Sequence, residues 1–107
     1  MSVQMNEFAR LDIRAARVTD INNIPGMKKI MKAKVDLGDR IVDAIVGGAE
    51  YYKPEDLRGK MVAVVANMEP RTVGGVRSEC MLLAADHHGK PIWLTLPDEV
   101  PLGTKIR

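Results

Sequence analysis

The feature that most constrains the fold is a series of short strand-like segments separated by turn residues. Within the expected strand 30–37, residues 31–37 alternate strictly between apolar and charged side chains. A period of two marks a strand with one buried face. Residues 40–46 follow directly after the tight turn Gly38-Asp39. Because this connection is so short, we expect the two strands to pair as a hairpin.

The rest of the chain continues this pattern. The apolar run at 61–66 predicts a strand buried on both faces. Pro54, the acids after it and Gly59 predict one helical turn over 53–59. Further strands are expected at 11–21, 80–85 and 92–96, with loops at 22–26, 67–75 and 97–103 and a polar turn at 86–90. Short strands at about ten-residue spacing predict an all-β fold, a five-stranded Greek-key barrel of the OB-fold type. Its one short helix lies between strands 3 and 4.

The chain of 107 residues has the size of one domain. We expect a barrel over 11–107, preceded by residues 1–10 as either a frayed tail or an arm that packs on something. The longest apolar run has six residues, far below the roughly 20 needed to span a bilayer. Residues 1–10 lack the apolar stretch of a signal peptide, and one cysteine excludes an internal disulfide. These features favour a cytoplasmic protein without membrane contact.

No group of residues indicates catalysis. His87-His88 is not expected to bind one metal, because neighbours on a strand point to opposite faces. The pair is interpreted as an exposed polar hairpin tip. Cys80 is interpreted as a half-buried structural thiol, since no cationic partner is evident to activate it. The glycine pairs match no phosphate-binding motif. We therefore expect no enzyme activity, no metal and no cofactor.

Positive charge is concentrated rather than abundant. The net charge is only +2, but residues 22–35 hold four lysines and no acid. These candidate nucleic-acid contacts are Lys28, Lys29, Lys32 and Lys34. Few aromatic side chains are present for base stacking, so an RNA would be recognised by backbone charge and shape. The alternative is a solvated strand face whose lysine stems cover the core.

The segment 67–81 offers the groups of a small ligand pocket. An amide, two planar guanidinium forks, a hydroxyl and a polarisable thioether occur within fifteen residues. These candidates are Asn67, Arg71, Arg77, Ser78 and Met81. An ordinary connection between strands, with its arginines in water, is the alternative.

Five blocks in order carry a family resemblance. They are LDIR at 11–14, VDLGD at 35–39, YYKPEDLRG at 51–59, VANMEPR at 65–71 and SECMLLAA at 78–85. From Phe8 to Ile106 the chain resembles the tRNA-binding domain family. That family includes the C-terminal domain of methionyl-tRNA synthetase, free-standing tRNA-binding proteins and archaeal synthetase beta subunits.

The resemblance implies an OB-fold that binds the outer corner of the tRNA L by its shape. It implies a homodimer, free-standing or acting in trans with a synthetase of the methionyl type. The family's functional positions fall on Lys29, Asn67, Arg71, Ser78 and Met81. Where the family commonly has an aromatic residue, this chain has Met31, and Cys80 replaces a glycine between Ser78 and Met81.

The export-chaperone branch of the same family is the alternative. Its members resemble the tRNA binders in fold and hold unfolded chains in an apolar groove. They share the pair Ser78-Glu79 and a closing run like that at 96–105. The lysine-rich stretch, Asn67 with Arg71, and the run at 81–85 favour the tRNA-binding branch.

Overall fold

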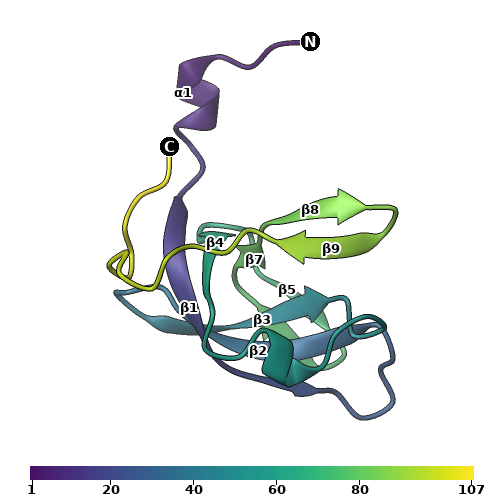
Figure 1. Ribbon diagram of the computed structural model, residues 1–107. Coiled ribbons are helices and arrows are strands. Elements are labelled where there is room, and N and C mark those ends of the chain that lie inside the picture. Colours follow the sequence, from purple (N-terminus) through teal and green to yellow (C-terminus); the bar gives the residue numbers. More distant parts are fainter.

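Five antiparallel strands form the main sheet, in the spatial order β3-β2-β1-β4-β7. The computed structural model describes residues 1–107, and its sheet curls into a nearly closed barrel (Figure 1). Its strands are β1 (Ile13–Asn23), β2 (Ile30–Asp36), β3 (Ile41–Gly47), β4 (Met61–Val65) and β7 (Met81–Leu82). The short helix between β3 and β4 is a 3₁₀ turn, η1 (Pro54–Asp56). The predicted all-β barrel with one small helix is confirmed.

The long strand β1 makes the curvature possible. Its first part, Ile13–Arg17, pairs with β4, and its second part, Arg17–Asn23, pairs with β2. A bulge between Val18 and Asp20 separates most of the β2 pairing from the β4 pairing. Bulges increase local bending and twist. One strand therefore belongs to both walls of the barrel.

The alternation seen in the sequence sets the core. In β2, Met31, Ala33 and Val35 are fully buried, while Lys32 and Lys34 are exposed. All five residues of β4 are buried, as the continuous apolar run predicts. The core combines these residues with Leu57 after η1 and with Cys80 and Leu82.

Several predicted boundaries are wrong. Residues 67–75 were expected to form a loop, but β5 (Arg71–Val73) pairs with β6 (Val76–Ser78) as a hairpin. The pair Gly74-Gly75, with φ of 57° and 78°, supplies the left-handed turn that such a hairpin needs. The expected strand at 80–85 is divided at Leu83. Its amide donates to the carbonyl of Ala63 at 3.0 Å, and the chain then leaves the barrel.

The segment after Leu83 forms a second hairpin, β8 (Ala84–His87) with β9 (Lys90–Trp93). It projects from the barrel in Figure 1. The last predicted strand, 92–96, therefore begins and ends earlier than expected. Residues beyond β9 close the barrel through isolated bridges, Val62 with Thr95 and Arg14 with Lys105.

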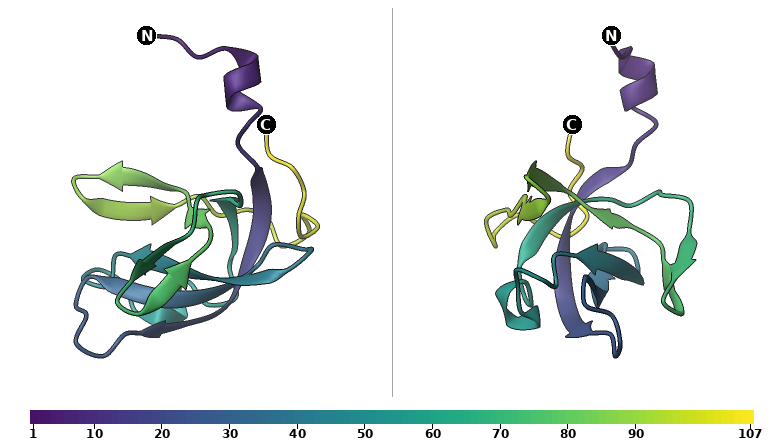
Figure 2. Two further views of the ribbon diagram at one scale, coloured as in Figure 1. Left: turned by 180° about the vertical axis from the view of Figure 1, so that it is seen from behind. Right: turned by 90° about the vertical axis from the view of Figure 1, so that its right-hand side faces the viewer.

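The first residues form an arm that stands clear of the barrel. It carries the short helix α1 (Met5–Phe8), which has no buried residue. Both termini leave from the same end of the molecule, and the loop after β1 lies at the opposite end (Figures 1 and 2). None of the helices is long and apolar enough to cross a membrane.

Candidate nucleic-acid interface

The four lysines fall into two pairs with different surroundings. Lys28 and Lys29 are exposed in the β1–β2 loop, and neither forms an ion pair. Lys32 and Lys34 point outward from β2 toward Asp43 on β3. Their Nζ atoms lie 3.8 and 3.2 Å from its carboxylate oxygens. One acid thus partly neutralises two of the four positive charges.

Sequence reasoning missed Asp43. The signal was available, because the short β2–β3 turn fixes the register of the hairpin and pairs Lys34 with Asp43. Charges directly opposite each other on one face of a sheet interact. The positive charge of the β2 face is therefore smaller than the number of lysines indicates.

The β5–β6 hairpin lies beside the lysine-bearing loop. A Cβ atom built on Gly74, at the hairpin tip, would lie 2.9 Å from Cε of Met27 and 3.9 Å from Cδ1 of Ile30. The two elements are thus in contact, on the same side of the molecule (Figure 2). Together, the β1–β2 loop and the β5–β6 hairpin form one surface, called the cationic surface below.

The two arginines of the hairpin differ. Arg71 is exposed and forms no ion pair. Arg77 is also exposed, but its Nε lies 3.9 Å from the carboxylate of Glu79. Lys28, Lys29 and Arg71 are therefore the candidate cations without an acidic partner.

A pocket of about 220 Å³ lies at the base of the hairpin. It brings together the predicted residues Arg71, Ser78 and Met81. The other lining residues are Ile45, Met68, Glu69 and Cys80. The Met68 and Met81 side chains give it a partly apolar wall, and Arg71 and Glu69 give it one charge of each sign. It is called the Arg71 pocket below.

The Ser78 hydroxyl is already used within the protein. Its Oγ accepts from the Ile45 amide at 3.0 Å and donates to the Cys80 carbonyl at 3.4 Å. The Glu79 amide donates to the Asp43 carbonyl at 3.0 Å. These contacts attach the hairpin to the free edge of β3, where no further strand pairs. Ser78 therefore closes the barrel and shapes the pocket from below.

Cys80 is buried more deeply than the sequence predicted, with 3% of its surface exposed. Burial raises the pKa of its thiol from 9.0 to about 11; Arg40 opposes this shift and Glu79 adds to it. A nucleophilic cysteine needs the opposite shift. The interpretation of Cys80 as a structural thiol agrees with this environment.

The histidine pair forms part of the exposed β8–β9 tip, as predicted. Its rings nevertheless lie close together, with centroids 4.7 Å apart in an edge-to-face arrangement. His88 has φ of 53°, so the strand rule for opposite faces does not apply at this turn. No group of three or more His, Cys, Asp or Glu side chains could hold a metal ion.

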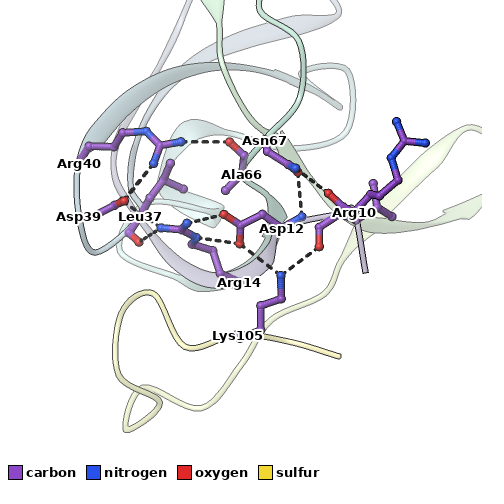
Figure 3. A network of polar contacts seen from close by, with 10 residues as sticks. Arg10, Asp12, Arg14, Leu37, Asp39, Arg40, Ala66, Asn67 and Lys105 are labelled. Atoms are coloured by element: carbon purple, nitrogen blue, oxygen red, sulfur yellow. Dashed lines mark hydrogen bonds and ion pairs between the residues drawn. The ribbon is translucent and has the colours of Figure 1, made fainter. Parts of the chain in front are cut away.

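Asn67 does not line the Arg71 pocket. Its side chain contacts the start of β1 instead, accepting from the Asp12 amide and donating to the Arg10 carbonyl, both at 2.8 Å (Figure 3). It lines a separate groove of about 700 Å³ beside the arm. The other residues of this groove are Val3, Met5, Glu7, Phe8, Arg10 and Leu11.

A polar network fixes the same end of the barrel. The Arg14 guanidinium contacts the carboxylates of Asp12 and Asp39 and the carbonyl of Leu37 (Figure 3). The hydrogen bond from Arg14 lowers the pKa of Asp12, against the opposing effect of burial. The same hydrogen bond raises the pKa of Arg14. The network joins β1 to the β2–β3 turn.

Met31 stands where the resembled family commonly has an aromatic residue. Its side chain is fully buried in the core, below the outer face that carries Lys32 and Lys34. A side chain in this place has no surface to offer a nucleic-acid base. The outer face of β2 therefore has no aromatic residue for stacking at this position.

Comparisons with known proteins show which proteins this chain is similar to. The family model described as "Putative tRNA binding domain" matches residues 13–105. The chain is 44% identical to a methionine–tRNA ligase of Thermococcus kodakarensis over 106 residues, which are 98% of the chain and 14% of that enzyme. It thus spans about a seventh of the length of this relative.

Two solved structures share the fold over the whole chain. A protein from Pyrococcus horikoshii described as related to the methionyl-tRNA synthetase MetRS superimposes with a TM-score of 0.95 at 30% identity, covering 100% of this chain and 99% of that one. The chaperone CsaA of Bacillus anthracis superimposes with a TM-score of 0.88 at 28% identity, covering 100% of both chains.

Proposed function

Because this chain belongs to the tRNA-binding domain family, we propose that it is a non-catalytic module that binds folded tRNA. The observation that carries the proposal is the contact between the lysine-bearing loop and the arginine-bearing hairpin at Met27 and Gly74. This contact supports a single surface that includes Lys28, Lys29 and Arg71. Phosphates of a pre-shaped RNA at matching spacing would bind there without base-specific contacts.

The proposed contacts follow from the surroundings of each residue. Lys28, Lys29 and Arg71 contact phosphates, and Met81 forms the apolar wall of the Arg71 pocket. Lys32, Lys34 and Arg77 contribute less, since each has an acidic neighbour. Asn67 and Ser78 support the surface through their contacts inside the protein. The outer corner of the tRNA L is the proposed target, as the family resemblance implies.

The test is a titration of folded tRNA at several salt concentrations. Three unpaired cations in each protomer predict a log–log salt slope of about −3, at roughly −0.9 per phosphate neutralised. An affinity that stays constant with salt would contradict the proposal. Heat-unfolded RNA of the same sequence should bind more weakly, because only the folded form presents phosphates at the spacing of the cationic surface.

Single substitutions locate the surface. Lys29→Ala and Arg71→Ala should each weaken tRNA binding about 3- to 10-fold, since each removes one charge-assisted phosphate contact. Glu55→Ala, at an exposed position of η1, is the matched control and should bind normally. Circular dichroism should show all three proteins folded. Normal binding by both Lys29→Ala and Arg71→Ala would place the site elsewhere.

The holding of unfolded polypeptide is a second candidate function. The superposition on a chaperone over the whole chain favours it, together with the apolar side chains of the arm groove. Competition separates the two functions. A denatured polypeptide that displaces tRNA and binds equally well in high salt would support the chaperone reading. A polypeptide that does not bind would leave tRNA as the ligand.

The proposed setting is the cytoplasm, where tRNA and synthetases occur. We propose that the chain acts there as a homodimer, or in trans with a methionyl-type synthetase. The barrel is then the binding domain, and residues 1–10 are the assembly contact. The arm supports this division because Val3, Met5 and Phe8 are exposed apolar side chains. Two barrels held together would raise the effective concentration of a modestly charged surface.

A further inference from the structure

The side-chain amide of Asn67 forms two hydrogen bonds to the backbone at the base of the arm, one through its oxygen and one through its nitrogen. The oxygen accepts from the Asp12 amide and the nitrogen donates to the Arg10 carbonyl, each at 2.8 Å. Figure 3 shows these two bonds side by side. A side-chain amide that bonds one backbone N–H and one backbone carbonyl of the same short segment fixes the orientation of that segment.

Two further groups hold the same three residues, one beside Asn67 on the chain and one near the C-terminus. Nζ of Lys105 donates to the Leu11 carbonyl at 3.1 Å, and the Ala66 amide donates to the Asp12 carbonyl at 2.7 Å. The helix beyond this root buries no residue. The direction of the arm is therefore set at residues 10–12 and not by packing of α1 on the barrel.

Asn67 also begins the segment that walls the Arg71 pocket. It lines the arm groove, while the next two residues, Met68 and Glu69, line the Arg71 pocket. Three consecutive residues thus separate the two cavities. Pro70 follows them, and its fixed φ limits the conformations at the end of this segment. The wall of the Arg71 pocket thus begins at the residue bonded directly to Asn67.

We propose that Asn67 is a positioning residue that couples the arm to the Arg71 pocket. With Asn67 bonded, the arm keeps its direction and the pocket wall keeps its shape. Release of the arm loosens the wall, and a ligand that orders the wall strengthens the hold on the arm. Such coupling is reciprocal by thermodynamic necessity. Its effect on the ligand side rests on the proposed function, whereas the hold on the arm does not.

Trypsin gives a direct measure of the hold. It cleaves after Arg10, whose carbonyl is the acceptor of the Asn67 bond, so cleavage requires that bond to open. Asn67→Ala should speed cleavage at Arg10–Leu11 roughly 10-fold or more, as expected for two lost hydrogen bonds. Cleavage after Lys28 and Lys29 in the exposed loop is the internal reference and should not change.

Two further variants complete this part. Asn23→Ala removes an exposed asparagine with no side-chain hydrogen bond in the protein and should leave cleavage at Arg10 unchanged. Lys105→Met removes the hydrogen bond to the Leu11 carbonyl and should also speed cleavage at Arg10–Leu11. An unchanged rate in folded Asn67→Ala would overturn the proposal, whatever the protein does with RNA.

Adding tRNA tests the coupling. In the wild-type protein, tRNA should slow cleavage at Arg10–Leu11 about 3-fold or more, and in Asn67→Ala this protection should disappear. Protection that persists in Asn67→Ala would mean that tRNA simply covers the arm and would overturn the coupling. A complete lack of tRNA binding would contradict the proposed function, but it would leave the effect of Asn67→Ala on cleavage intact.

Discussion

Asp43 sets the charge that the β2–β3 face offers. Its carboxylate lies between Lys32 and Lys34, and about a third of its side chain is exposed, at 31%. Ion pairs this close to solvent contribute about 0–1 kcal/mol to stability. Removing this acid should therefore change the electrostatic field of the face far more than the stability of the barrel.

We predict that Asp43→Asn strengthens tRNA binding about 2- to 5-fold at low salt, and that the gain shrinks as salt screens the freed lysines. Asp98→Asn is the matched control. It also frees a cation, Arg17, at 3.5 Å, but outside the cationic surface. Fluorescence titration of the two variants checks the prediction. Equal gains in both would show that only total charge matters.

Cys80 predicts how stability depends on alkaline pH. The thiol pKa is near 9.0 before folding and about 11 in the folded protein, because burial disfavours the thiolate. The folded state therefore holds its proton more tightly. The contribution of the protonated thiol to the free energy of unfolding is fully present below pH 9.0 and is lost as pH rises toward 11. The free energy of unfolding should fall by up to about 1.4 kcal/mol per pH unit in this range.

Urea unfolding of the wild-type protein and Cys80→Ala between pH 8 and pH 11 measures this effect. The wild type should lose stability faster across the window, whatever the absolute difference between the two at neutral pH. Parallel curves would show that groups common to both proteins account for the whole decline.

At the scale of the element, the β5–β6 hairpin joins the two halves of the cationic surface. Its tip touches the lysine loop through Gly74, and its base is fixed to β3 through Ser78. Gly74 and Gly75 both have positive φ, at 57° and 78°. A Cβ at Gly74 meets Met27, whereas one at Gly75 meets nothing within 4 Å.

This difference gives a matched pair of variants. Asparagine tolerates the left-handed region better than other side chains. Gly74→Asn should push the lysine loop from the hairpin and weaken tRNA binding about 2- to 5-fold by separating the charges. Gly75→Asn should bind normally. Melting curves should show similar stability for both, and equal affinity would show that the Met27 contact is not needed.

How much the sequence could predict depended on the range of the interactions. The β2 alternation and the buried run of β4 are local patterns, so these strands were predicted within one residue. The hairpin at 71–78 was missed because three-residue strands leave almost no periodic signal, although Gly74-Gly75 marked the turn. The division at Leu83 depends on Ala63 and Leu94, which are distant in sequence.

The candidate site was predicted in composition more than in arrangement. Arg71, Ser78 and Met81 do meet at one pocket, because they lie on one hairpin and the strand after it. The composition of segment 67–81 and the resemblance both placed Asn67 with them, but its partners are Arg10 and Asp12, more than fifty residues earlier. No short-range pattern reports such a contact. The same holds for the hydroxyl of Ser78, whose partner is on β3.

At the scale of the whole molecule, the stability of the barrel does not depend on the arm. No residue of α1 is buried, and residues 10–12 carry the bonds that fix the start of β1. We predict that deletion of residues 1–9 leaves the melting temperature within about 3 °C, since it removes no core side chain. The proposed dimer should dissociate. A sizing column checks both forms, and a truncated protein that stays dimeric would move the contact to the barrel.

Both termini lie at the same end of the molecule, and this position determines where a fused domain would lie. A catalytic domain, a linker or a label joined at either terminus would lie at the α1 end of the molecule. The lysine-bearing loop lies at the opposite end. Different fused domains could therefore be attached at this end of the barrel without covering the cationic surface. Fusion at the C-terminus should leave the cationic surface open, whereas an insertion between Ile24 and Met27 should disrupt it.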